Sequence, residues 1–225
     1  MPQEQTLIYS HLRTPRAAAV AGIAFSILLV IIFWVFRSAV PADPLDSGTW
    51  LADGSGRVAL ALNLIPFAGI AFLWFIGVLR DRLGPKEDRF FATVFLGSGL
   101  LFLAVLFVAA TIVGALLIVA PSTEPTGTGV VPTFQFARAV AYILVNVYAI
   151  KMAGVFMIST STVVIYTGIA PRWMAGIGYA LAALVLLGSY YLSWSIMVLP
   201  VWVLLISGHI LIDNLRRKDG SPLQP

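Results

Sequence analysis

The sequence predicts an all-α fold, a polytopic integral membrane bundle of six transmembrane helices. Hydrophobic residues make up 60% of the 225 residues, charged residues only 11%, and the mean hydropathy is +0.95. Soluble domains average about 45–50% apolar and about 25% charged residues, so a soluble domain of this composition would leave much apolar surface in water. The chain also contains apolar runs that reach the length of about 20 residues needed to cross a bilayer. Residues 1–225 are therefore expected to form a single membrane domain.

Six apolar runs are the expected spans. A helix rises about 1.5 Å per residue, so about 20 residues cross a hydrocarbon core of about 30 Å. The runs do not alternate apolar and polar residues, as the strands of a membrane barrel would. The third and fourth runs are longer than a bilayer requires, so these helices either tilt steeply or project together beyond one face. The expected spans are residues 17–36, 58–79, 90–120, 137–170, 174–192 and 195–212.

Basic residues predict the side of the membrane on which each loop lies, because cytoplasmic loops carry an excess of Lys and Arg. With the N-terminus in the cytoplasm, ten basic residues fall inside and three fall outside, and six spans return the C-terminus to the cytoplasm. The net charge of +4 is thus explained as a topology signal, and nucleic acid is not an expected partner. The inside residues are Arg13, Arg16, Arg80, Arg82, Lys86, Arg89, Arg172, Arg216, Arg217 and Lys218, and the outside residues are Arg37, Arg57 and Arg138.

Lys151 lies within a run that is otherwise uncharged, NVYAIKMAGVFMISTSTVVIY (146–166). A lysine at the bilayer centre costs roughly 2.5–3.5 kcal/mol on insertion scales, which makes a functional site the default hypothesis. At about 100° per residue, Tyr148, Thr162 and Tyr166 lie within about 60° of Lys151 around a regular helix. This face is a candidate binding site for an anionic headgroup or a carboxylate, or a proton relay. An untilted helix would instead place Lys151 at the outer interface, where its stem reaches water, and both interpretations stay open.

Two other polar features bear on chemistry. The hydroxyls of STST (159–162) can bond to carbonyls one turn back along the helix, or can line a polar path. His209 and Asp213 are four residues apart near the cytoplasmic end of the sixth span and are the nearest candidates for a metal site, but Asp213 also fits an ordinary helix end. No metal, cofactor or catalytic residue is expected, because the sequence has no cysteine, no Gly-x-Ser-x-Gly elbow, no phosphate loop and no His-Glu-x-x-His motif.

Small residues in the fifth span predict close helix packing. Gly176 with Ala180, and Gly178 with Ala182, stand at the four-residue spacing that lets helix backbones approach each other in lipid. This pattern supports a compact bundle and does not specify an oligomeric state.

Two segments resemble small six-span membrane proteins of actinobacteria and related bacteria, a group with no assigned function. These segments are EDRFFATVFLGSGLLFLAVLFVAA (87–110) and MAGVFMISTSTVVIYTGIAPRWMAGIGYALAALVLLGS (152–189). The turn GIAPRWMAGIG, with its Pro-Arg-Trp step between two spans, is the most recognisable piece. The resemblance implies a multi-pass protein of a bacterial plasma (inner) membrane and carries no catalytic residue over.

These observations predict a non-enzymatic integral membrane protein, an accessory or scaffold component of a bacterial membrane assembly. Its expected partners are the lipid bilayer and another membrane protein. The alternative is a small permease or a lipid- or anion-binding carrier that uses the Lys151 face of the fourth span. A membrane enzyme acting on lipid ranks third, because candidate acids and bases do not converge in the sequence.

Overall fold

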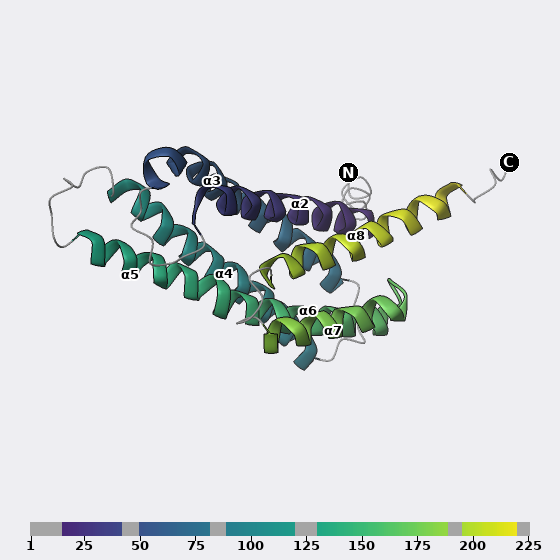
Figure 1. Cartoon of the computed structure of the whole chain (residues 1–225). Coiled ribbons are helices and arrows are strands. Elements are labelled where there is room, and N and C mark those ends of the chain that lie inside the picture. The colour runs from purple at the N-terminus through teal and green to yellow at the C-terminus, as the bar shows by residue number, and fades with distance from the viewer. Residues whose placement is uncertain (1–14, 42–49, 82–88, 120–129, 189–194, 220–225) are drawn as a thin grey trace, which may run out of the picture.

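The computed structural model describes residues 15–41, 50–81, 89–119, 130–188 and 195–219, and within these ranges the chain is all-α, as predicted. Five helices are long and apolar enough to cross a membrane, and a sixth, α7, is apolar but shorter. This number counts the continuous segments α5, η3 and α6 as one helix. The chain is therefore built as a multi-pass membrane protein. The elements are α2 (Pro15–Ala39), α3 (Trp50–Asp81), α4 (Arg89–Val119), α5 (Val130–Ile143), η3 (Leu144–Ala149), α6 (Ile150–Thr167), α7 (Arg172–Gly188) and α8 (Ser195–Asp219) (Figure 1).

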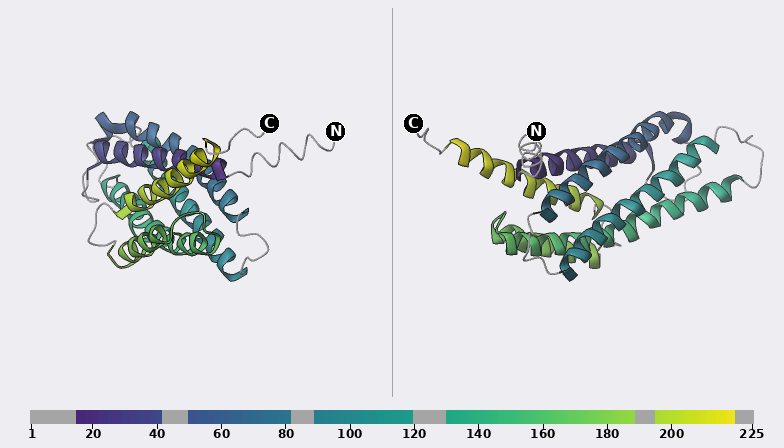
Figure 2. Two further views of the ribbon diagram at one scale, coloured as in Figure 1. Left: turned by 90° about the vertical axis from the view of Figure 1, so that its right-hand side faces the viewer. Right: turned by 180° about the vertical axis from the view of Figure 1, so that it is seen from behind.

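Consecutive helices run in alternating directions, so that α2 begins and α8 ends at the same end of the bundle (Figures 1 and 2). We call this end proximal, and the end at which α2 stops distal. Helix α2 packs chiefly against α3 and α8, whereas α6 packs chiefly against α4 and α7. At the distal end α4 and α5 extend together past α7 and α8 (Figure 1). The long third and fourth apolar runs thus form a helix pair that projects beyond α7 and α8, and the start of α3 extends nearly as far (Figure 1).

The turn between α6 and α7 shows why the fourth run stops earlier than its hydropathy indicates. Helix α6 ends at Thr167, and Gly168 follows with a φ of +66°, a left-handed conformation that suits a residue without a Cβ. Its N–H donates to the Val164 carbonyl at 3.0 Å. Pro171 then precedes α7, and its carbonyl accepts from the Met174 N–H at 3.0 Å. Apolar residues 168–170 therefore belong to the turn and not to the helix.

The long fourth helix contains a π-helical segment, η3, over six residues. Ile150 donates its N–H to the carbonyl of Val145, five residues back, and the backbone remains right-handed helical at both junctions. A π turn holds more residues than an α turn. Side chains on the two sides of η3 are therefore rotated relative to the positions that a regular α-helix predicts.

The centre of the bundle is a cluster of phenylalanine rings around Phe72 of α3. The Phe72 ring centroid lies 4.4 Å from that of Phe25 in α2, 5.6 Å from that of Phe102 in α4 and 5.0 Å from that of Phe156 in α6. All four side chains are almost fully buried. Because lipid tails are as apolar as these rings, van der Waals packing and ring contacts, and not removal from water, hold the four helices together.

Small residues set the closest approach of α7 to its neighbours. Gly178 and, one turn further on, Ala182 are buried, whereas Gly176 is exposed. A Cβ on Gly178 would lie 2.7 Å from a ring carbon of Trp202 in α8 and closer still to the Ser161 hydroxyl of α6. A Cβ on Gly176 would meet nothing within 4 Å. Of the two predicted glycine–alanine pairs, the one containing Gly178 forms the packing face.

Gly178→Ala is expected to lower the free energy of unfolding by about 1–3 kcal/mol, the usual cost of overpacking a core, because the added methyl must displace Trp202 and Ser161. Gly176→Ala, on the exposed face of the same helix, is the matched control. It should be neutral or slightly stabilising, since alanine is the better helix former. Denaturant unfolding of the purified chain in detergent measures both variants. Equal stabilities would contradict the close packing at Gly178.

Candidate functional site

Lys151 lies in the first turn of α6 and is half-buried. Its ammonium donates a hydrogen bond to the backbone carbonyl of Leu186 in α7. Because α7 ends at Gly188, Leu186 is among its last four residues. The carbonyls of these residues receive no hydrogen bond from an N–H group of their own helix. The C-terminus of a helix also carries partial negative charge, which favours a cation. Lys151 therefore caps the distal end of α7, a role that the sequence analysis did not consider.

Gly154 allows α7 to come close enough for this hydrogen bond. A Cβ on Gly154 would lie 2.7 Å from Leu186 Cγ and 3.1 Å from Val185 Cγ2. Gly154 stands three residues after Lys151, so the two residues lie on the same side of α6. The glycine after the lysine in KMAG was the sequence signal of a close helix contact at this point.

Thr162, another residue of the predicted binding face, also faces α7, about 16 Å further along α6. Its hydroxyl oxygen lies 2.7 Å from the hydroxyl oxygen of Tyr179 in α7, a hydrogen bond between the two helices. Lys151 and Thr162 thus belong to one helix–helix interface. Tyr148 and Tyr166 are 56% and 78% exposed and lie on the outside of the bundle. The structure brings two of the four predicted residues to one interface and leaves the two tyrosines outside it.

Three residues of the STST run are buried, Thr162 is half-buried, and the run is mostly bonded to its own helix. Ser159 and Thr160 donate to carbonyls four residues back, at 3.0 and 2.8 Å. The Ser161 hydroxyl and the Trp202 indole N–H, which both border Gly178, have no hydrogen-bond partner within the described ranges. The run therefore takes part in packing α6 against α7 and α8.

The predicted metal candidates, His209 and Asp213, are both half-buried and lie one turn apart near the proximal end of α8. The described residues contain no group of three or more His, Cys, Asp or Glu that could hold a metal ion. The other histidine, His11, lies outside the described residues.

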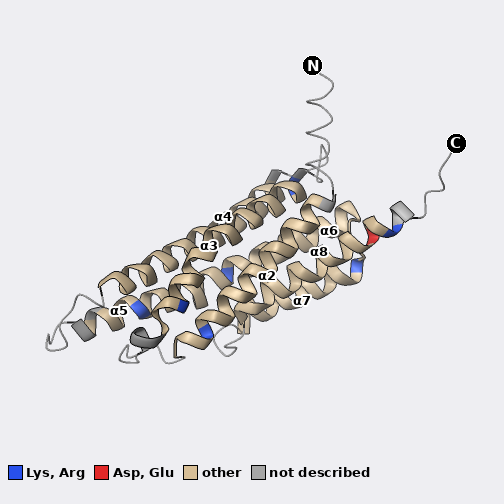
Figure 3. Ribbon diagram, turned by 90° about the horizontal axis from the view of Figure 1, so that it is seen from above, with Lys and Arg blue, Asp and Glu red and all other residues tan. Residues whose placement is uncertain are grey.

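Two arginines that the sequence predicts on the outside also bind backbone carbonyls at a helix end. Arg138 of α5 is 8% exposed and donates to the Pro41 carbonyl at 2.7 Å, just beyond the end of α2. Arg57 of α3 donates to the Ser38 carbonyl at 3.5 Å, in the last turn of α2. The described Lys and Arg residues lie mainly toward the two ends of the bundle (Figure 3). Of the residues predicted inside, Arg13, Arg82 and Lys86 lie outside the described ranges.

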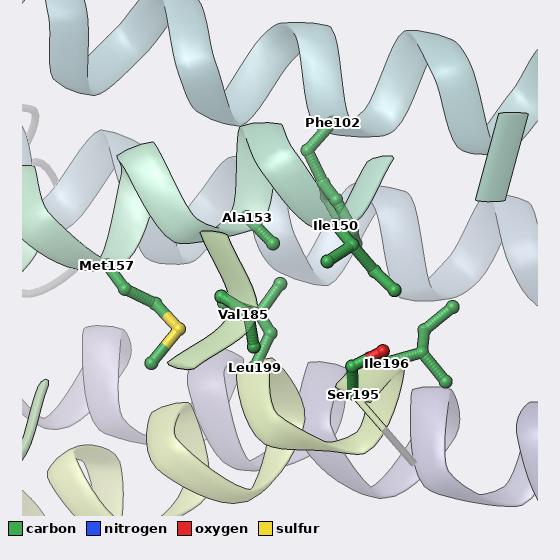
Figure 4. A pocket seen from close by; sticks show the side chains of 8 residues that line it. All are labelled: Phe102, Ile150, Ala153, Met157, Val185, Ser195, Ile196 and Leu199. Carbon is green, nitrogen blue, oxygen red and sulfur yellow. The ribbon is translucent and has the colours of Figure 1, made fainter. Parts of the chain in front are cut away.

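A small pocket lies between α4, α6, α7 and α8, next to the capped end of α7 (Figure 4). Its cavity volume is about 10 Å³, room for about one water-sized sphere. Ser195 is 4% exposed, and its hydroxyl is the only oxygen among the lining side chains. Sequence analysis missed this pocket because its walls are apolar and come from four helices. The lining residues are Phe102, Ile150, Ala153, Met157, Val185, Ser195, Ile196 and Leu199.

Long apolar helices of alternating direction, with polar side chains turned onto helix ends and helix interfaces, define a multi-pass α-helical membrane protein. Comparison of the chain with protein-family models, with curated proteins and with solved structures finds no significant match. The resemblance to small six-span bacterial membrane proteins stays a prediction.

Lys151→Met keeps an unbranched apolar stem but removes the ammonium. It is expected to lower the free energy of unfolding by about 1–3 kcal/mol, because the Leu186 carbonyl loses its donor. Amide hydrogen exchange in the last turn of α7 should become faster for the same reason. Lys151→Arg keeps a cation at the helix end and should preserve both properties. A methionine variant with unchanged exchange in α7 would show that the hydrogen bond does not hold this helix end.

Proposed function

We propose that the chain is a non-enzymatic accessory or scaffold component of a bacterial plasma-membrane assembly, with six spans and both termini in the cytoplasm. The observation that carries the proposal is the distal extension of α4 and α5. We infer that this extension carries apolar side chains beyond the reach of the lipid tails, because both helices are longer than the hydrocarbon core is thick.

The lengths of these helices support the extension. Helix α4 has 31 residues, and the apolar helix Phe134–Thr167 has 34. At about 1.5 Å per residue they measure about 46 Å and about 51 Å, against a hydrocarbon core of about 30 Å. A tilt of about 40°, the upper end of the observed range, still leaves about 35 Å and about 39 Å along the membrane normal. Tilt alone therefore does not accommodate them.

The part of α5 that extends past α7 and α8 exposes large apolar groups. Phe136 is 71% exposed, Tyr142 49% and Ile143 47%. Apolar surface that neither lipid tails nor the rest of the chain covers is typical of a protein interaction site. A second membrane protein whose surface rises above the bilayer on the same side would cover this part of α5.

Two of the four polar groups on the alternative carrier face already have partners within the bundle. The Lys151 ammonium is bonded to the end of α7, and the Thr162 hydroxyl is bonded to Tyr179. Both contacts hold two helices together. They therefore favour the accessory role over a permease in which the Lys151 face would have to bind and release a solute.

The proposed six-span topology counts α7 as a full span. With 17 residues, α7 is about 25 Å long, somewhat shorter than the hydrocarbon core of about 30 Å. A capped distal end allows such a short span, because its last carbonyls would otherwise lie in lipid without donors. The excess of basic residues at the proximal end supports a cytoplasmic position for that end.

Single-cysteine labelling tests this topology, since the chain contains no cysteine. Trp173, 62% exposed at the start of α7, marks the proximal end, and the exposed Pro132 of α5 marks the distal end. In spheroplasts a membrane-impermeant maleimide should label Pro132→Cys at once. It should label Trp173→Cys only after the membrane is permeabilised. The reverse pattern would invert the topology, and labelling of both sites in intact spheroplasts would exclude six spans.

Site-specific photo-crosslinking tests the accessory role. A photoreactive residue in place of Phe136 should crosslink to one defined membrane protein in native membranes. The same residue in place of Phe67, 61% exposed at the middle of α3, should crosslink to lipid only and is the matched control. Phe136→Ala should also lower co-purification of that protein relative to Phe67→Ala. Lipid adducts alone at both positions would contradict the proposal.

A further inference from the structure

Asn63 presents an amide on the outer surface of α3. The side chain is exposed, and its Nδ2 donates to the Ala59 carbonyl, four residues back in the same helix, at 2.9 Å. A side-chain amide has two N–H donors and a carbonyl oxygen that accepts. One N–H and Oδ1 of Asn63 are therefore without a partner in the part of the chain that the structure describes.

This amide lies at the depth of the lipid tails. Arg57 binds the last turn of α2 and so marks the distal end of that apolar helix. Asn63 stands six residues nearer the Phe72 cluster than Arg57 does, a distance of about 9 Å along α3. Lipid tails offer no hydrogen bond, and a polar group left without a partner among them is costly.

Pro66 adds a second hydrogen-bond acceptor on the same side of α3. It lies inside the helix and is exposed. Proline has no N–H, so the Leu62 carbonyl, four residues earlier, lacks its usual helical donor. Leu62 directly precedes Asn63, and Pro66 follows Asn63 by one turn. The outer surface of α3 therefore offers two acceptors and one donor to a group that packs on it.

The residues around Asn63 have the spacing of a helix-packing stripe. Alternating steps of four and three residues place side chains along one line of a helix, which is the pattern by which two helices pack along their length. At about 100° per residue, Leu60 and Phe67 project about 80–100° away from this line, toward one flank. The stripe consists of Ala59, Asn63, Pro66, Ile70, Leu73 and Gly77, all exposed except Ala59, which is half-buried.

We propose that this stripe of α3 is the interface at which a second copy of the chain binds. Copies inserted in the same orientation pair about a twofold axis along the membrane normal, so the two α3 helices run parallel and each stripe residue meets its counterpart. Asn63 then faces Asn63 of the second copy. Because an amide both donates and accepts, the free N–H of each copy bonds to Oδ1 or to the Leu62 carbonyl of the other.

The symmetry of the pair is the reason for this choice of partner. A different protein would need a matching polar group at the same depth, whereas a second copy carries that group by necessity. A single asparagine in a packing stripe also fixes the register and the number of helices that associate. The stripe is separate from the distal part of α5, so this interface goes beyond the accessory role and does not depend on it.

Disulfide crosslinking of single-cysteine variants tests the interface in membranes that hold the full chain. Ile70→Cys, 60% exposed within the stripe, should form a dimer on oxidation with copper phenanthroline, at twice the mass of the chain. Leu60→Cys, 57% exposed on the flank, is the matched control and should stay monomeric. A dimer yield at position 70 no greater than that at position 60 would overturn the assignment of this face.

Sedimentation equilibrium of the purified chain in density-matched detergent tests the amide itself. Asn63→Leu should raise the dimer dissociation constant about tenfold, the effect of two weak hydrogen bonds between membrane helices. Asn63→Gln keeps a donor and an acceptor and should retain most of the affinity, and Leu60→Ala should leave it unchanged. Position 63 is exposed, so helix content by circular dichroism should stay constant. A monomeric wild type, or a leucine variant that dimerises as tightly as the wild type, would contradict the proposal.

Discussion

The carbonyl groups at the distal ends of the helices impose the constraint on which the rest of this bundle depends. Within a bilayer, a backbone carbonyl without a donor is costly, and every helix leaves its last four carbonyls without a partner of its own. Lys151 supplies a donor for the end of α7, and Arg138 and Arg57 supply donors around the end of α2. Two of the three basic residues predicted on the outside, Arg57 and Arg138, are therefore bound at a helix end, as is Lys151.

The cap on α7 determines how the bundle is divided. Lys151 and Gly154 hold α7 against α6, which also packs on α4. Helix α8 packs chiefly on α2, which also packs on α3. The phenylalanine cluster around Phe72 joins these two groups of helices at their centre. Toward the distal side, α7 and α8 have little contact with each other, and the pocket lies in the space between them and α4.

The sequence predicted the all-α class, the long third and fourth helices and the packing role of Gly178, because hydropathy and small-residue spacing report these features directly. It did not predict the role of Lys151, since the acceptor is the Leu186 backbone carbonyl, which has no side-chain signature. The sequence also did not predict the π-helical segment before Lys151. This segment rotates Tyr148 relative to Lys151, so the two side chains do not lie where a regular α-helix would place them. The sequence did not predict the pocket, because lining residues such as Ala153 and Leu199 are ordinary apolar residues that only the fold brings together.

A charged residue inside a membrane span is usually interpreted as part of a transport path or a catalytic site. Lys151 supports a different interpretation, because its ammonium is hydrogen-bonded to the Leu186 carbonyl at the end of a neighbouring helix. Within a bilayer that carbonyl would be costly to leave without a donor. A solute that bound the Lys151 ammonium would have to compete with this hydrogen bond in every transport cycle, whereas a structural cap keeps it permanently.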